Sequence, residues 1–116
     1  EILLNTETKD FAFDGLNLRC VHSTAPTYGE RMTDALREVK TEYTLLLLDE
    51  PAAGMNPSET AELMENIRTI RDTFKIAVLL IEHDMSLVMN ICEGIAVLSF
   101  GRIIAKGTPD RGLLGP

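Results

Sequence analysis

The chain of 116 residues has no tryptophan and no glutamine, and only four Phe and two Tyr. So few aromatic rings do not supply the stacking surface on which single-stranded nucleic acids bind. Lys and Arg number 11 against 18 Asp and Glu, for a formal net charge of −7, so a basic face that neutralises phosphates is also missing. The acidic balance equally disfavours an anionic membrane surface as the sole partner. We therefore expect no nucleic acid among the partners.

Cysteine is scarce and no apolar stretch is long. Cys20 and Cys92 lie far apart and form no Cys-x-x-Cys pair, so we expect two free thiols rather than a disulfide or a zinc site. No run reaches the roughly 18 consecutive apolar residues of a membrane span. With 45% apolar and 25% charged residues, the composition is ordinary for a globular domain with one core.

Two short apolar runs, each followed by acidic residues, organise the second half of the chain. Residues 45–48 are four leucines that lead into Asp49-Glu50-Pro51, and residues 76–81 lead into Glu82-His83-Asp84. Their length and the proline favour strands that are buried on both faces.

A helix is predicted between the two runs. Asn56 and Pro57 are typical of a helix start, and Glu59 completes a capping box. Apolar residues then recur at helical spacing, at Leu63, Met64, Ile67, Ile70 and Phe74. Strand, helix and strand in this order predict an α/β fold with a βαβ core of parallel strands.

The remaining segments are shorter. We expect a helix over residues 85–93 capped by Asp84, strands at 95–100 and 103–105 that form a C-terminal β-hairpin around Gly101-Arg102, a short helix from Thr108, and a frayed tail over 112–116. In the first 43 residues we expect strands at 2–4 and 16–21, a turn near Asp14-Gly15, and helical turns within 33–39.

The candidate functional residues directly follow the two apolar runs. Ligands bind beyond the carboxyl ends of parallel strands, where Asp49 suits Mg²⁺ and Glu50 can orient or deprotonate a water. His83 would share that edge if the strands are adjacent, and it could then hydrogen-bond a phosphate. The alternatives are a strand that ends in a polar turn and a histidine with a structural role. An unrelated Mg²⁺-dependent phosphatase is a further alternative.

In their order along the chain, these motifs resemble the second half of an ABC-transporter nucleotide-binding domain. Residues 45–50 resemble Walker B followed by the catalytic Glu, and His83 resembles the switch histidine. Gly54-Met55-Asn56 resembles the D-loop, with Asn56 where the family more often has Asp. Residues 80–85 and 101–109 are most similar to the ATPase subunits of branched-chain amino-acid importers. Tyr28-Gly29-Glu30 resembles a degraded signature motif, the alternative being an ordinary turn.

The resemblance implies a partial P-loop NTPase-like domain over residues 44–116, preceded by a divergent segment over 1–43. It implies that Glu50 and His83 are catalytic, that Asp49 holds the metal, and that Asp49, Tyr28, Gly29 and Asn56 contact the cofactor. ATP and Mg²⁺ are the implied cofactors and membrane permease subunits the implied partners. The implied location is the cytoplasm, at the inner face of the membrane.

Two of the family's motifs are missing. No Gly-Lys pair occurs, so the Walker A pattern G-x-x-x-x-G-K-S/T is absent, and without glutamine there is no Q-loop. The chain is roughly half as long as a domain of this family, which suggests an internal deletion or, alternatively, a highly divergent segment. Residues 9–16 resemble the family's first hairpin, with Phe11 or Phe13 near the adenine-stacking aromatic.

These departures set the expected function. Each charge-assisted hydrogen bond lost with the phosphate loop is worth about 1.5–3 kcal/mol, so we expect little or no ATP hydrolysis by this chain alone. Strands that would be interior in a whole domain become edges, which favours a homodimer. A non-catalytic binding or assembly protein derived from the family is the alternative.

Overall fold

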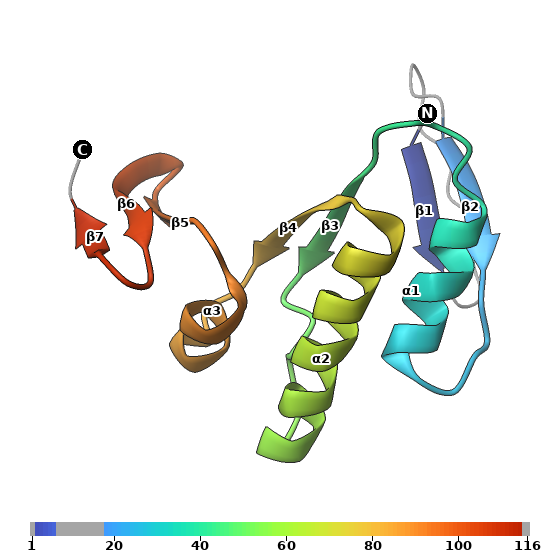
Figure 1. The fold of residues 1–116 in the computed structure, drawn as a ribbon, viewed down its shortest axis with the longest axis horizontal. Helices are drawn as coiled ribbons and strands as arrows, with labels where there is room; N and C mark the ends of the chain where they lie inside the picture. Colours follow the sequence, from blue (N-terminus) through green and yellow to red (C-terminus); the bar gives the residue numbers. More distant parts are fainter. Residues whose placement is uncertain (1, 7–17, 115–116) are drawn as a thin grey trace. The chain divides into compact units, whose positions relative to one another are not determined.

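The computed structural model describes residues 2–6 and 18–114. Contacts divide the chain into a first unit, Glu1–Leu47 with Glu65–Leu79, and a second unit, Leu48–Met64 with Leu80–Pro116. The elements in chain order are β1 (Ile2–Thr6), β2 (Leu18–His22), α1 (Tyr28–Arg37), β3 (Leu45–Asp49), α2 (Pro57–Phe74), β4 (Ala77–Ile81), α3 (Met85–Ile91), β5 (Ile95–Ser99), β6 (Arg102–Thr108) and β7 (Gly112–Leu114) (Figure 1).

The first two strands pair in parallel, with Ile2 opposite Leu18 and Thr6 opposite His22. Both strands were expected from the sequence, and residues 16 and 17 of the second predicted strand lie outside the described residues. The predicted turn near Asp14-Gly15 and the hairpin-like residues 9–16 lie outside the described residues.

The strands β3 and β4 pair with each other, and α2 connects them. At one end the Ala77 N–H donates to the Thr44 carbonyl (3.3 Å), and at the other the Glu50 N–H donates to the Ile81 carbonyl (2.7 Å). From the first of these bonds to the second, the residue numbers rise along both strands. The strands are therefore parallel, as Figure 1 shows. The predicted βαβ core is confirmed, and so is the start of α2, where Asn56 Oδ1 accepts the Glu59 N–H at 2.8 Å.

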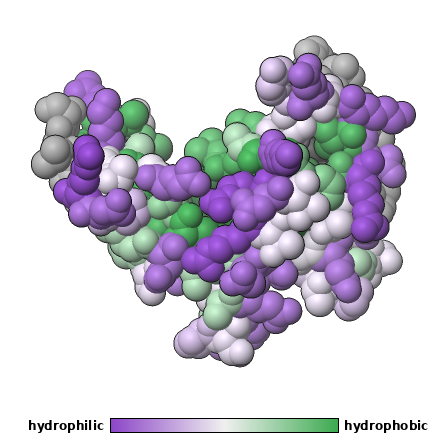
Figure 2. Space-filling model, in the orientation of Figure 1, coloured by the Kyte–Doolittle hydropathy of each residue, from purple (hydrophilic) through white to green (hydrophobic). Residues whose placement is uncertain are grey.

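The prediction that these strands are buried on both faces is wrong. Leu48 is buried, but Leu45, Leu47 and Leu79 are 61%, 57% and 50% exposed in the first unit. Alternation along a strand places these leucines on the face opposite Leu48. An apolar run indicates a strand that can be covered on both faces, but burial also requires a second layer, which the described residues of this unit do not supply. Figure 2 shows hydrophobic residues at the surface among hydrophilic ones.

Each unit has its own small set of buried apolar side chains. In the first unit they are Met32 and Leu36 of α1 with Ile67 and Ile70 of α2, and in the second unit they are Leu48, Leu63, Leu87 and Val88. The α2 residues are those that the helical spacing predicted.

Helix α1 begins earlier than the sequence suggested. Thr27 Oγ1 accepts the Glu30 N–H, and the Glu30 carboxylate accepts the Thr27 N–H, which together form a capping box. The interpretation of Tyr28-Gly29 as an ordinary turn is therefore wrong, because these residues open a helix. The predicted helical turns within 33–39 are the later part of α1, which ends at Arg37.

The C-terminal strands form an antiparallel sheet in the order β5-β6-β7. The predicted hairpin is confirmed, but its turn lies at Phe100 and Gly101, whose φ values of 50° and 77° are those of a tight two-residue turn. The predictions of a helix from Thr108 and of a frayed tail are wrong over residues 108–114. Thr108 is the last residue of β6, and β7 pairs with residues 106–108, which satisfies its backbone groups.

Helix α3 follows its predicted cap. Asp84 Oδ1 accepts the Leu87 N–H at 3.2 Å, and the helix ends at Ile91, two residues before the predicted end. Cys92 is a free, partly buried thiol, and burial raises its pKa; the side chain of Cys20 is outside the description. Within the described part of the chain, no helix combines the length and apolarity that crossing a membrane requires.

Candidate active site

Glu50 directly follows β3 in an unusual backbone conformation. Its φ of 46° lies in the left-handed region. This conformation is energetically unfavourable for any residue that has a Cβ atom. The conformation is held on both sides of the residue: the Glu50 N–H donates to the Ile81 carbonyl, and the Glu50 carbonyl accepts the Ala53 N–H at 3.1 Å. Non-glycine residues in this region often mark functional sites.

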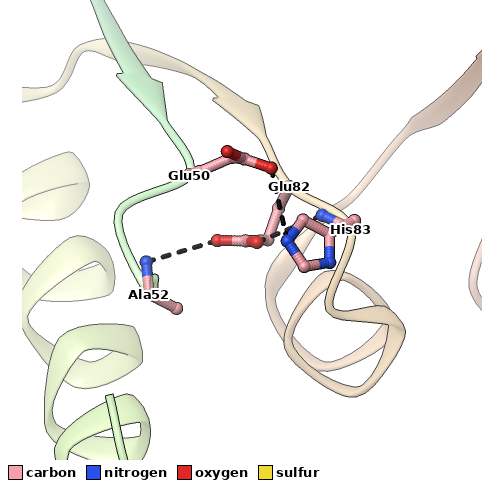
Figure 3. Close-up of polar contacts among 4 residues, drawn as sticks. All are labelled: Glu50, Ala52, Glu82 and His83. Carbon is pink, nitrogen blue, oxygen red and sulfur yellow. Dashed lines mark hydrogen bonds and ion pairs between the residues drawn. The ribbon is translucent and has the colours of Figure 1, made fainter. Parts of the chain in front are cut away.

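The end of β4 brings His83 to Glu50. His83 Nε2 lies 3.3 Å from Glu50 Oε1 (Figure 3). The parallel pairing of β3 and β4 therefore places these two side chains at one edge, as the sequence predicted. Because the side chains of His83 and Glu50 are 80% and 50% exposed, solvent screens the pair, and exposed pairs of this kind contribute only about 0–1 kcal/mol.

Glu82 is a site residue that the sequence analysis did not assign. Its Oε2 accepts the Ala52 N–H at 3.3 Å, and its Oε1 accepts the His83 N–H at 3.1 Å (Figure 3). The available signal was a carboxylate placed directly before the histidine at a strand end. Sequence spacing does not show which amides such a side chain reaches, so this signal alone could not define its contacts.

Asp49 is the last residue of β3, and it is exposed. Proteins usually bind Mg²⁺ through one or two carboxylates together with substrate phosphates. No group of three or more His, Cys, Asp or Glu side chains that could hold a metal occurs among the residues the structure describes. Asp49 would therefore supply one protein ligand, and the other ligands of a Mg²⁺ ion would come from nucleotide phosphates and water.

Asn56 and Gly54 lie in the turn that leads into α2. Asn56 Oδ1 is engaged as the cap of α2, and Gly54 has a φ of 76°, a conformation that glycine adopts without strain. A role of Asn56 in nucleotide contact would have to coexist with capping.

Tyr28 and Gly29 belong to the first unit. Gly29 is buried, and a Cβ at this position would lie 2.7 Å from the side-chain Cγ of Asn66 on α2. The guanidinium carbon of Arg31 lies 5.8 Å from the centroid of the Tyr28 ring. Burial raises the pKa of Tyr28, and the charge of Arg31 partly offsets this. Both residues thus have local contacts within α1 and between α1 and α2.

Comparison with solved structures relates this arrangement to a known class. The chain matches cbiO1 from Clostridium perfringens, part of the ABC transporter complex cbiONQ, with a TM-score of 0.59 and 28% sequence identity. The match covers 73% of this chain and 34% of that one. The fold is therefore that of part of an ABC ATPase domain.

Comparison with curated sequences narrows the class. The high-affinity branched-chain amino acid transport ATP-binding protein LivG of Escherichia coli is 47% identical over 85 residues, and BraF of Pseudomonas aeruginosa is 46% identical over the same length. Each match covers 72% of this chain and 33% of the relative, so the chain spans about a third of the length of these relatives. No protein-family model matches the chain. Its homologues therefore include the ATP-binding proteins of branched-chain amino-acid ABC transporters.

Proposed function

We propose that the chain is a truncated ATP-binding subunit of an ABC importer similar to those for branched-chain amino acids, and that it does not hydrolyse ATP alone. The contact between Glu50 and His83, at the ends of two parallel strands, is the observation that carries this proposal. The sequence identity to LivG and BraF supports the proposed type of transporter.

In this proposal each site residue has its own role. His83 donates a hydrogen bond to the terminal phosphate, and Glu50 orients the attacking water and accepts its proton. Mg²⁺, when bound with nucleotide, would neutralise phosphate charge beside Asp49. Asn56, Tyr28 and Gly29 are the proposed nucleotide contacts.

The absence of a phosphate-binding loop limits the activity. The backbone amides and the lysine of Walker A supply several charge-assisted hydrogen bonds to phosphate, and no Gly-Lys pair exists in this sequence. The exposed pair of Glu50 and His83 cannot replace them. We therefore expect ATP to bind too weakly for turnover unless another polypeptide supplies that loop.

Isothermal titration of the chain with Mg-ATP tests this proposal. We expect no saturable stoichiometric heat and no phosphate release above that of a Glu50→Gln variant, which lacks the general base. Tight binding of one nucleotide per chain would contradict the proposed loss of activity. Phosphate release that Glu50→Gln abolishes would show an active enzyme instead.

A non-catalytic assembly protein is the second candidate, because apolar side chains remain exposed. Leu45, Leu47 and Leu79 leave about half or more of their surface in solvent. Among the described residues, both β3 and β4 are edges of a two-stranded sheet. Edges and exposed leucines recruit partners, either a second copy of this chain or the membrane permease subunits with which importer ATPases associate at the inner face of the membrane.

Analytical ultracentrifugation distinguishes self-association from a monomer. We expect the chain to sediment as a dimer at high concentration and a Leu47→Glu variant to shift toward monomer, while Glu62→Gln at an exposed position of α2 serves as the control. A wild-type chain that stays monomeric throughout the concentration series would exclude the homodimer.

A further inference from the structure

The contact between Glu50 and His83 needs a support other than its own attraction. The His83 side chain is mostly exposed and the Glu50 side chain is half exposed, and exposed ion pairs hold their partners weakly. Glu50 also occupies a left-handed conformation that an unsupported loop would leave. Something else must therefore fix the segment after β3 against the segment after β4.

Glu82 is the side chain in position to do this. It is half-buried and follows β4 directly, between Ile81 and His83. One carboxylate oxygen accepts the N–H of Ala52, in the segment after β3, and the other accepts the N–H of His83. Figure 3 shows this carboxylate between the two segments, beside the pair that they carry. Carboxylate acceptors make stronger hydrogen bonds to amides than neutral acceptors do.

The turn after β3 is tied at two points. The backbone bond from the Glu50 N–H to the Ile81 carbonyl fixes its start, and the bond from the Ala52 N–H to Glu82 fixes it two residues further on. Further along the turn, the Met55 N–H donates to the Ala52 carbonyl at 3.0 Å, so Ala52 is bonded through both of its backbone groups. With one tether at Glu50 itself and the other at Ala52, the turn holds the Glu50 side chain toward His83.

We infer that Glu82 is a positioning residue that holds Glu50 against His83. It does not touch the reacting groups in this account. Its importance for ATP hydrolysis rests on the proposed function, whereas the tether itself is a property of the folded chain. The two claims therefore require separate readouts.

The chemistry of the carboxylate defines a graded set of variants. Glu82→Ala removes both acceptors. Glu82→Gln keeps the length of the side chain, but its amide offers one acceptor oxygen and one donor group, so it can satisfy only one of the two N–H groups. Glu62→Ala on the exposed surface of α2 removes a carboxylate without known contacts and serves as the matched control.

Amide hydrogen exchange followed by NMR tests the tether. We expect exchange at Ala52 and His83 to become about tenfold faster in Glu82→Ala, the effect of losing a hydrogen bond worth about 1.4 kcal/mol. Glu82→Gln should accelerate only one of the two amides. The buried Leu63 and Leu87 amides, and all amides in Glu62→Ala, should keep their rates. Unchanged exchange at both Ala52 and His83 in Glu82→Ala would overturn the inference.

The His83 ring signals test positioning itself, which a general loss of stability would not reproduce. At one fixed pH, Glu50→Gln should shift the ring signals of the wild-type chain, because it removes the charge next to Nε2. In the Glu82→Ala background the same change should have no effect, and in the Glu82→Gln background a reduced one. A full response in Glu82→Ala would show that Glu82 does not position the pair. If the tether is confirmed and Mg-ATP binds tightly to the chain, the structural inference stands and the proposed loss of activity fails; if the amides and ring signals do not respond while Mg-ATP still does not bind, the proposed function stands and the tether fails.

Discussion

At the scale of single residues, Glu50 carries the strain of the site. Its φ of 46° places the Cβ close to the backbone, a conformation that glycine tolerates without cost. The bonds to Ile81 and Ala53 offset this strain. Such an arrangement aims a carboxylate at the strand edge instead of letting the chain continue as an extended strand.

The strain predicts an unusual order of stability for two variants. Both Glu50→Ala and Glu50→Gly lose the contact with His83, but only glycine relieves the left-handed conformation. We expect Glu50→Gly to be more stable than Glu50→Ala by about 1 kcal/mol, although glycine normally destabilises a chain through its greater entropy when unfolded. Urea unfolding followed by circular dichroism measures the difference, and a less stable glycine variant would contradict the strain at this position.

At the scale of elements, α1 and α2 approach closely where Gly29 meets Asn66. A Cβ at position 29 would lie 2.7 Å from the Asn66 side chain, closer than van der Waals contact allows. The glycine that resembles part of a signature motif therefore also has a packing role in the first unit. Either role accounts for glycine there, and a stability measurement detects the packing role.

We expect Gly29→Ala to lower the free energy of unfolding by about 1–2 kcal/mol through overpacking, the opposite of the usual gain when alanine replaces glycine in a helix. Combining it with Asn66→Ala should recover most of the loss, since the clash is then removed. Gly94→Ala is the control, because a Cβ there meets nothing within 4 Å. Urea unfolding of the four chains measures this, and a neutral Gly29→Ala would remove the proposed packing role.

The elements were predictable where local chemistry decides them. The leucine run at β3, the cap Asn56 and the helical spacing at Leu63, Ile67 and Ile70 were sufficient for the βαβ core. The start of α1 is also encoded locally, since Thr27 and Glu30 have the spacing of a capping box. The strand β7 has only three residues, and it depends on a partner strand rather than on its own sequence.

At the scale of the whole molecule, the sequence predicted the contact between site residues correctly, but it did not predict which apolar residues are buried. Parallel strands bring their carboxyl ends together by construction, so the meeting of Glu50 with His83 followed from topology. The exposure of Leu45, Leu47 and Leu79 depends on the layers present in the folded chain, which no local pattern contains. The hydrogen bond from the Ala52 N–H to Glu82 is likewise tertiary, whereas the bond from the His83 N–H joins sequence neighbours.

The chain is short compared with its homologues. The chain spans about a third of LivG and BraF, and the Walker A pattern does not occur in it. The described residues place Glu50 beside His83, the two side chains for which we propose contacts with water and phosphate.

The central claim is that the side chains of Glu50 and His83 meet beyond the ends of β3 and β4. Nuclear Overhauser effects between the Glu50 side-chain protons and the two His83 ring protons that flank Nε2 test this contact directly. With Nε2 at 3.3 Å from Glu50 Oε1, we expect these effects in the wild-type chain. Their absence, in a folded chain that still shows contacts between β3 and β4, would contradict the proposed site.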